Sequence, residues 1–200
     1  MPILSDILQS LGKDNAVFSN LDLLSGYWQI PLDEKSREIT AFSTPLGHFE
    51  FLRMPFGLRN APLTFQRMIN TLFAGLIGNT VCAYLDDLIV VSKDADSHLI
   101  KLREVLAKLS TAGLKIKLSK CEFVKSRIHF LGHVVDGEGI HTVNDKVKAV
   151  SQFPRPTSND HVRSLLGLSG YYRSFIKDCA TLASPLTRLL KKRCSVYIGC

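Results

Sequence analysis

Three aspartates are the residues of this sequence best suited to carry out a chemical reaction. Asp86 and Asp87 are adjacent in the middle of the apolar run 81–92, and Asp22 lies at the end of the apolar segment 16–23. Neighbouring carboxylates repel one another and resist removal from water, so they add no stability to an apolar strand. A divalent cation removes this conflict, because it neutralises the charges and accepts oxygen ligands.

The chemistry that suits such a cluster is phosphoryl transfer. If the segments that carry Asp22 and the Asp86-Asp87 pair are neighbouring strands, three carboxylates converge on one point. Such a group can hold two hard cations, which clamp the attacking and leaving oxygens of the reaction. Magnesium is preferred, because it keeps water and substrate phosphates in its coordination shell. The alternative is a solvated turn at Asp86-Asp87 and an ordinary strand end at Asp22, which is the commoner role of such residues.

The elements that position these acids are expected to be strands. Strand-favouring residues on both sides of Asp86-Asp87 predict a hairpin over 81–92 with the two acids at its turn. Residues 16–23 predict a strand that ends close to Asp22. Further strand candidates are 40–51, as strand, turn and strand, then 114–118 and 129–135.

Helices are predicted between these strands from apolar residues at helical spacing. Asn60 is expected to cap a helix with Pro62 in its first turn, and Ser97 is expected to cap the next helix, which ends at Gly113. Other helices are predicted over 3–11, 145–153 and 162–176. Helices and strands interleave without a regular βαβ rhythm, so the expected fold class is α+β.

The net charge of +7 is unevenly placed along the chain. Residues 1–96 carry 7 basic and 11 acidic side chains, whereas residues 97–130 carry 8 and 2, and residues 161–200 carry 7 and 1. A polyanion such as nucleic acid is a natural partner for the two basic stretches. On charge alone, a solvated basic face explains them equally well.

Several protein classes are disfavoured by composition. The five cysteines are odd in number and form no C-x-x-C pair, which argues against a disulfide framework and a structural zinc site. No apolar run approaches the roughly 20 residues needed to cross a bilayer. The first residues also lack the basic-then-apolar layout of a signal peptide. We therefore expect a soluble intracellular protein, in a cytoplasmic particle or the nucleus, that is neither secreted nor bound to a membrane.

Five segments, in the same order as in the family, resemble the motifs of reverse transcriptases from gypsy-like LTR retrotransposons. They are the first catalytic motif at 18–30, the nucleotide- and template-binding segment at 54–62, the Y-x-D-D box at 84–87, the primer grip at 130–133 and the early thumb at 165–176. The similarity spans nearly residues 1–190. It implies a polymerase palm, an antiparallel sheet backed by helices, over 1–135. It further implies a partial helical thumb or connection start over 136–190, an unassigned tail at 191–200, and fingers that are largely absent.

The resemblance also implies roles for individual residues. Asp22, Asp86 and Asp87 would be the catalytic metal ligands for two Mg²⁺ ions, with Mn²⁺ also possible. The residues that would bind the incoming dNTP are Tyr27 as a steric gate against the ribose 2′-hydroxyl, Phe56 as a pocket wall and Lys120 near the triphosphate, where it could protonate pyrophosphate. The residues that would contact the template and primer are Arg59, Pro62, Gln66, Leu131, Gly132, His133, Tyr172 and Arg173.

Simpler roles stay open for several of these residues. Tyr27 could be a core aromatic, and His133 could be an ordinary exposed strand histidine. Arg59 and Arg173 could be ordinary surface charges.

The function implied by the resemblance is that of an RNA-directed DNA polymerase core. It would extend a primer 3′-hydroxyl on an RNA or DNA template, as a truncated fragment of a Pol polyprotein that also holds protease, RNase H and integrase. The alternative is a non-catalytic, nucleic-acid-binding remnant of such a polymerase. A metal-dependent nuclease is a weaker alternative, because a hydrolase needs neither a steric gate nor a primer grip.

Overall fold

The chain divides into two compact units in this computed structural model, which describes residues 7, 11 and 14–190. The first unit comprises Met1–Phe130 and Val135–Ile140, and the second comprises Leu131–Val134 and His141–Cys200. Most of the helix predicted over 3–11, and the whole tail at 191–200, lie outside the described residues.

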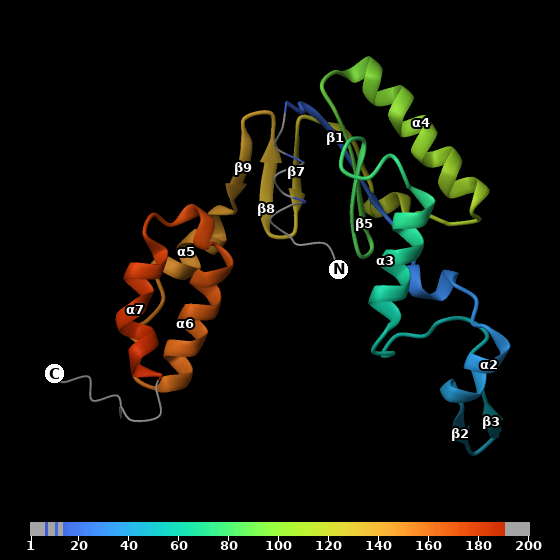
Figure 1. Cartoon of the computed structure of the whole chain (residues 1–200), viewed down its shortest axis with the longest axis horizontal. Helices are drawn as coiled ribbons and strands as arrows, with labels where there is room; N and C mark the ends of the chain where they lie inside the picture. The colour runs from blue at the N-terminus through green and yellow to red at the C-terminus, as the bar shows by residue number, and fades with distance from the viewer. Residues whose placement is uncertain (1–6, 8–10, 12–13, 191–200) are drawn as a thin grey trace. The chain divides into compact units, whose positions relative to one another are not determined.

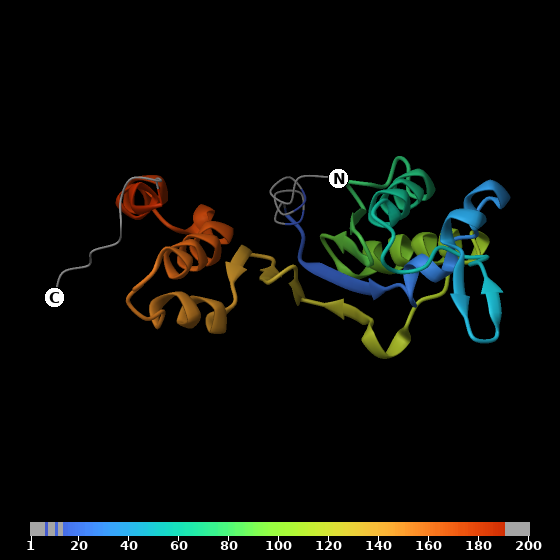
Figure 2. The same ribbon diagram turned by 90° about the horizontal axis from the view of Figure 1, so that it is seen from below.

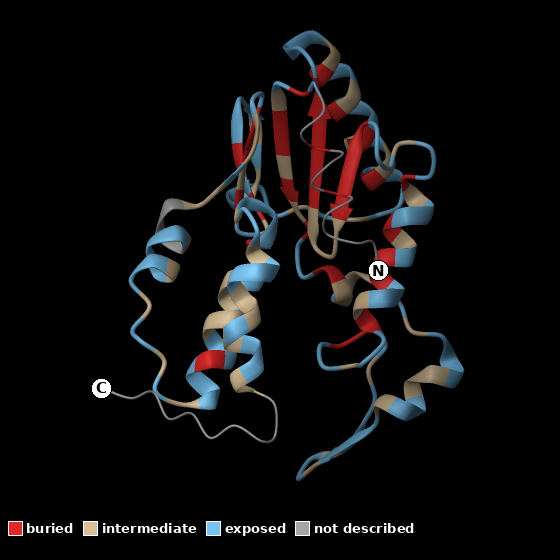
Figure 3. Cartoon of the chain, turned by 60° about the vertical axis from the view of Figure 1, so that its left-hand side comes forward, coloured by how far each residue is buried: buried red, intermediate tan, exposed pale blue. Residues whose placement is uncertain are grey.

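A four-stranded antiparallel sheet forms the centre of the first unit (Figure 1). Its order is β4 (Val81–Tyr84), β5 (Asp87–Ser92), β1 (Val17–Asp22) and β6 (Glu122–Lys125). Figure 3 shows buried residues concentrated in the central strands. The hairpin and the strand that were predicted around the three aspartates are therefore both confirmed.

Two helices cover one face of this sheet, as Figure 2 shows. They are α3 (Ala61–Leu72) and α4 (Ala95–Thr111). The apolar residues packed between sheet and helices include Leu21, Leu23, Val81, Ala83, Leu88, Val90, Phe65, Ile69, Leu102, Val105 and Leu109. Alternate residues of each strand supply this core, because successive side chains of a strand point to opposite faces.

The starts of the two helices differ in how well they were predicted. Asn60 does occupy the cap position of α3, but its side chain makes no capping hydrogen bond. The cap of α4 is Asp94, whose carboxylate accepts from the Ser97 backbone N–H at 2.8 Å. The prediction that Ser97 is the cap was therefore wrong by one helical turn. Aspartate and serine are both favoured cap residues, so the sequence alone did not separate them.

Two predicted strands were wrong in position. Residues 114–118 form no strand; Ile116 makes a single bridge to Leu23, and the chain then enters the 3₁₀ turn η3 (Leu118–Lys120). Residues 129–135 are interrupted by a turn at Leu131-Gly132, where φ is 45° and 73°. The strands observed there are β7 (Arg127–Phe130), β8 (His133–Asp136) and β9 (Gly139–Thr142), which pair in that order.

The segment between β1 and α3 consists of short elements. It contains η1 (Gly26–Gln29), α2 (Glu34–Arg37) and η2 (Glu38–Thr40), followed by β2 (Phe42–Thr44) and β3 (Gly47–Phe49). The two strands form a separate two-stranded sheet, which confirms the strand, turn and strand expected over 40–51.

The described part of the second unit is mainly helical. Its helices are α5 (Asn144–Ser151), α6 (Asn159–Tyr171) and α7 (Cys179–Leu189), with the short turn η4 (Arg173–Phe175) after α6. The helix predicted over 162–176 thus ends at Tyr171, and α7 was not anticipated. None of the described helices is long and apolar enough to pass through a bilayer. The expected α+β class is confirmed.

Candidate functional site

Two of the three aspartates face each other across neighbouring strands. Asp22 is the last residue of β1, Asp87 is the first residue of β5, and the two are direct partners in the antiparallel register. Tyr84 of β4 is the partner of Asp87 on its other side. Directly opposite residues share one face of a sheet, so these three side chains lie on the same face. The strands β1 and β5 are therefore neighbours, as the expected convergence required, and the convergence of all three carboxylates on one point stays a prediction.

The third aspartate lies in the turn that joins β4 to β5. This turn consists of Leu85 and Asp86, and Leu85 has a φ of 53°, which is unusual for a residue other than glycine. A positive φ at the first position is what a tight two-residue hairpin requires. The turn is held from below by Gln66 of α3, whose Oε1 accepts from the Leu85 N–H at 2.9 Å.

Gln66 thus has a different place from the one expected for it. Its side chain is 3% exposed, and its Nε2 also donates to the carbonyl of Ala83 at 3.2 Å and to Oδ1 of Asn70 at 3.0 Å. These bonds direct the amide into the protein beneath the turn, and not toward a template at the surface. The signal in the sequence was its position beside Phe65 and Ile69 on the apolar face of the helix, which favours a buried polar anchor.

Asp86 approaches the backbone of Gly26 closely. A Cβ built on Gly26 would lie 2.7 Å from Oδ1 of Asp86 and 2.7 Å from the ring of Phe65, so only glycine fits at this position. The same Oδ1 is buried and has no hydrogen-bond partner among the residues that the structure describes. A buried carboxylate oxygen without a donor is costly, and a cation would satisfy it.

The electrostatic surroundings of the pair also favour a cation. The pKa of Asp86 is raised above its ordinary value, first by burial and then by the negative charge of Asp22. The pKa of Asp87 is raised by burial, by Asp22 and by Asp86. Lys120 opposes both shifts. Three carboxylates that repel one another, and oxygen donors only, are the ligand set that suits hard divalent cations.

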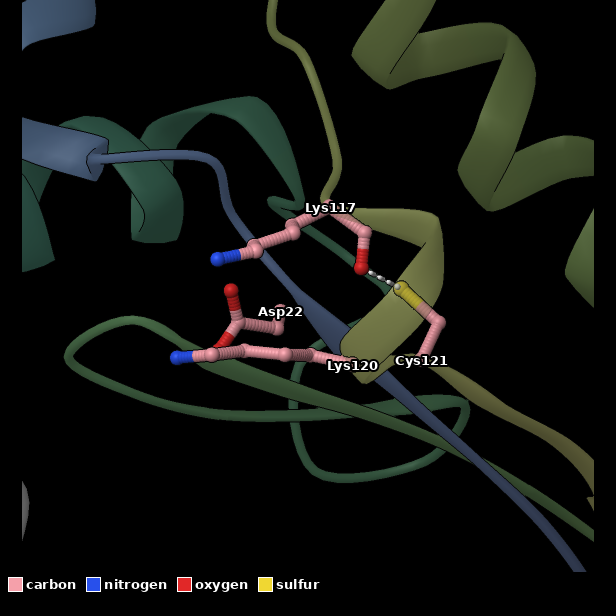
Figure 4. A network of polar contacts seen from close by, with 4 residues as sticks. All are labelled: Asp22, Lys117, Lys120 and Cys121. Atoms are coloured by element: carbon pink, nitrogen blue, oxygen red, sulfur yellow. Dashed lines mark hydrogen bonds and ion pairs between the residues drawn. The ribbon is translucent and has the colours of Figure 1, made fainter.

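Two lysines approach Asp22 from the η3 segment. Lys120 Nζ lies 3.5 Å from Oδ2 of Asp22, and the Lys117 backbone N–H donates to the Asp22 carbonyl at 2.8 Å. Figure 4 shows both lysine side chains beside the Asp22 carboxylate. The thiol of Cys121 donates to the Lys117 carbonyl at 3.3 Å, which helps to fix the 3₁₀ turn. Lys117 was not singled out in the sequence, because nothing local distinguishes it from the other lysines nearby.

Tyr27 lies between the core and the surface beside these acids. Its ring is 5.5 Å from that of the buried Phe65, edge-on, and 5.2 Å from that of Phe56, which is 56% exposed. Burial, and then the charge of Asp86, raise the pKa of the Tyr27 hydroxyl. Tyr27 therefore packs on the core, as a core aromatic would, and also lies near the acidic cluster.

The remaining predicted contacts of the first unit are at the start of α3. Arg59 is exposed just before the helix, and Pro62 is half-buried in its first turn. The Arg59 side chain is therefore accessible to a binding partner, and the Pro62 side chain is partly accessible.

The second unit contains the other predicted contacts. The carbonyls of Leu131 and Gly132 accept from the hydroxyls of Tyr171 and Tyr172 at 2.5 and 3.1 Å. His133 is 2% exposed, so it is not an ordinary exposed strand histidine, and burial lowers its pKa. Tyr172 is 7% exposed. Of the predicted contacts here, the exposed groups are Gly132 and, in η4, Arg173.

Comparison with known proteins shows which protein family this chain resembles. The family model for reverse transcriptase (RNA-dependent DNA polymerase) matches residues 4–135. The chain is 47% identical over 196 residues to the retrovirus-related Pol polyprotein from transposon 297 of Drosophila melanogaster, covering 98% of this chain and 18% of that protein. It is 42% identical over 191 residues to the corresponding polyprotein from transposon gypsy of the same species, covering 96% of this chain and 18% of that protein.

Solved structures of a viral reverse transcriptase also match this chain. The foamy viral protease-reverse transcriptase in complex with dsDNA matches with a TM-score of 0.84 and 25% identity, over 95% of this chain and 39% of that chain. The same viral protein in complex with an RNA/DNA hybrid matches with a TM-score of 0.80 and 25% identity, over 94% and 25% of the two chains. The chain thus spans about a fifth of the length of its curated relatives and at most about two fifths of these solved chains.

Proposed function

This chain belongs to the reverse transcriptase (RNA-dependent DNA polymerase) family, and we propose that it forms the nucleotidyl-transfer centre of a retrotransposon RNA-directed DNA polymerase. The observation that carries the proposal is the position of Asp22 directly opposite Asp87, with Asp86 in the adjoining turn. The chain spans only 18% of the two fly polyproteins, so the substrates and partners named below belong to the proposal. The palm would comprise residues 1–135, and the start of the thumb residues 136–190.

Asp22, Asp86 and Asp87 would hold two Mg²⁺ ions, or Mn²⁺ in their place. The unpartnered Oδ1 of Asp86, and the raised pKa values of Asp86 and Asp87, support this assignment. Reverse transcriptases in general depend on divalent metal ions, and such ions supply charge neutralisation at the transferred phosphate and activation of the attacking hydroxyl. The protein's part is to keep three carboxylates in place before substrate binds, through the strand register and the Gln66 bonds.

Selection of the nucleotide would fall to the aromatic residues beside the acids. Tyr27 is held by Phe65 on its buried side, so the ring cannot retreat into the core, and it would exclude a ribose 2′-hydroxyl. Phe56 would line the same pocket. Lys120, whose side chain is 59% exposed, would turn toward the triphosphate and donate a proton to the leaving pyrophosphate.

Each unit would contribute residues that contact the template or the primer. Arg59 and Pro62 would contact the template, whereas the 131–133 turn would hold the primer end and Arg173 would pair with a backbone phosphate. The related foamy viral enzyme has been solved with dsDNA and with an RNA/DNA hybrid, which supports this substrate class. The relatives are Pol polyproteins, so protease, RNase H and integrase domains would be the further partners.

Primer extension with Mg²⁺ tests the proposal directly on this chain. We expect incorporation of dNTP on an RNA template. The rate of incorporation should fall by at least about a hundredfold in Asp86→Asn, because an uncharged amide nitrogen replaces one carboxylate oxygen. Asp96→Asn is the matched control, since Asp96 is an exposed acid in the first turn of α4. Equal activity of Asp86→Asn and wild type would reject the assignment. Salt-sensitive duplex binding without any extension would favour the binding remnant instead.

A further inference from the structure

The turn Leu131-Gly132 is held by two adjacent tyrosines at the end of α6. Both turn residues have positive φ, 45° and 73°, which is unfavourable for leucine in particular. The Tyr171 hydroxyl donates to the carbonyl of Leu131 and the Tyr172 hydroxyl donates to the carbonyl of Gly132. Both carbonyls of the turn are thus fixed by one helix, 40 residues away in sequence.

The ring of the next residue adds a second set of contacts. His133 stacks with Tyr171 and with Phe175, with ring centroids 5.5 Å apart in each case. The ring of Tyr172 meets His133 at 5.4 Å and Tyr171 at 4.9 Å, edge-on in both cases. Such aromatic pairs are favourable beyond the area that they bury. The turn and the end of α6 therefore form one packed cluster.

The division of the chain into units agrees with this packing. Residues Leu131–Val134 group with the helices of the second unit, although Phe130 before them and Val135–Ile140 after them group with the first. Gly132 is also required by the cluster. A Cβ on it would lie 3.2 Å from the Tyr172 hydroxyl oxygen, at a φ of 73°.

We propose that Tyr171 and Tyr172 are positioning residues, which latch the primer-holding turn to α6 through the carbonyls of Leu131 and Gly132. The proposal rests on the proposed function, which gives this turn a primer to hold. A peptide unit is planar and trans, so fixing the Leu131 carbonyl also fixes the Gly132 N–H, which points away from Tyr171. That N–H is a backbone donor suited to a primer phosphate, and the latch sets its direction.

Amide hydrogen exchange tests the latch without any need for activity. We expect the segment 129–135 to exchange faster in Tyr171→Phe and Tyr172→Phe, by about two- to tenfold for each hydroxyl removed, and fastest in the double variant. Ser169→Ala is the matched control. It removes a hydroxyl from the same helix, and within the described part of the chain that hydroxyl bonds to the helix carbonyls of Leu165 and Leu166 and not to the turn. Wild-type exchange in the double variant would overturn the latch.

Primer extension by the same variants tests what the latch is for. We expect the KM for the primer–template to rise by about two- to tenfold per hydroxyl, while the KM for dNTP and the activity of Ser169→Ala stay unchanged. A purely structural role would instead lower the melting temperature and leave the KM for primer–template as it was. Faster exchange with an unchanged primer KM would therefore overturn the positioning role. If the wild-type chain extends no primer, the proposed function fails, and exchange alone decides whether the latch exists.

Discussion

At the scale of single residues, the acidic centre is supported by side chains that take no part in its chemistry. Gln66 accepts from a backbone N–H of the turn that carries Asp86 and donates to a carbonyl of β4 just before that turn. Gly26 leaves the space that the Asp86 carboxylate and the ring of Phe65 occupy. The contacts that each residue makes can be recognised only when the turn is seen against α3 and η1, because their partners are distant in sequence.

Replacement of Gln66 by leucine should damage the site more than the fold. The change keeps a side chain of similar size but removes the bonds that Gln66 makes to the Leu85 N–H and the Ala83 carbonyl, and we expect the free energy of unfolding to fall by about 1–3 kcal/mol. Extension activity should fall at least tenfold, since the turn loses its anchor. Asn70→Ala is the control, because it removes only a side-chain partner of Gln66 and keeps both bonds to the turn. Chemical denaturation and extension rates measure both effects, and equal behaviour of the two variants would contradict the anchor role.

Loss of Asp86 should stabilise the metal-free chain. A carboxyl whose pKa is raised on folding contributes stability only at low pH, and this contribution is lost as pH rises through the folded pKa. At neutral pH the charged Asp86 therefore opposes folding, and Asp86→Asn should melt about 2–4 °C higher without metal. Addition of Mg²⁺ should raise the melting temperature of the wild type but not that of the variant. A lower melting temperature for Asp86→Asn without metal would contradict this reasoning.

At the scale of elements, the buried His98 of α4 makes hydrogen bonds to two strands of the sheet. His98 Nδ1 lies 2.7 Å from Ser92 Oγ of β5, and Nε2 lies 2.7 Å from Ser19 Oγ of β1. Ser92 donates its proton to the Asp94 carbonyl, so it accepts from Nδ1–H, and Nε2 is left to accept from Ser19. Every group is satisfied when the imidazole is neutral, and protonation would leave a donor without an acceptor. Burial, and then the charge of Lys101, lower the pKa of His98 accordingly.

The stability of the first unit should therefore depend on pH through His98. Its pKa is lowered on folding, so its contribution is complete above the unfolded value of about 6.5 and is lost as pH falls from there through the folded pKa. We expect the free energy of unfolding, measured by urea denaturation with the fluorescence of Trp28 as the signal, to fall between pH 7.5 and pH 5. His98→Gln should be less stable at pH 7.5 and should show a smaller dependence on pH. The exposed His129 provides the control, as His129→Gln should keep the wild-type profile.

The elements themselves were predicted with uneven success. The apolar segment that ends near Asp22 and the two apolar flanks of Asp86-Asp87 were sufficient to predict β1, β4 and β5, because these strands lie in the core. The turn inside 129–135 was not predicted, since Leu131 is an unexpected residue for a positive φ and the tyrosines that hold it lie 40 residues away. The role of His98 was not predicted either, because its partner Ser19 is 79 residues away in sequence.

At the scale of the whole molecule, the two basic stretches predict how the chain responds to salt. When duplex binding releases counterions, the logarithm of the binding constant falls linearly with the logarithm of the salt concentration, with a slope of about 0.9 for each phosphate neutralised. Arg173→Ala should therefore reduce this slope by about 1 while weakening binding to all sequences alike. Arg163 is the control on the same unit, because it pairs with Asp160 at 2.7 Å, and Arg163→Ala should change the slope less. Fluorescence anisotropy across a salt series measures both slopes, and an unchanged slope for Arg173→Ala would exclude its phosphate contact.

The register between β1 and β5 has a consequence for folding itself. A shift of the pairing by one residue would turn every side chain of β1 to the opposite face of the sheet. Asp22 would then point into the apolar layer beneath α3 and α4, and Leu21 would point out of it. Burial of an unpaired carboxylate in that layer costs several kcal/mol, so the shifted pairing is strongly disfavoured. The carboxylate that would coordinate the cation thus also favours the correct alignment of β1 with β5.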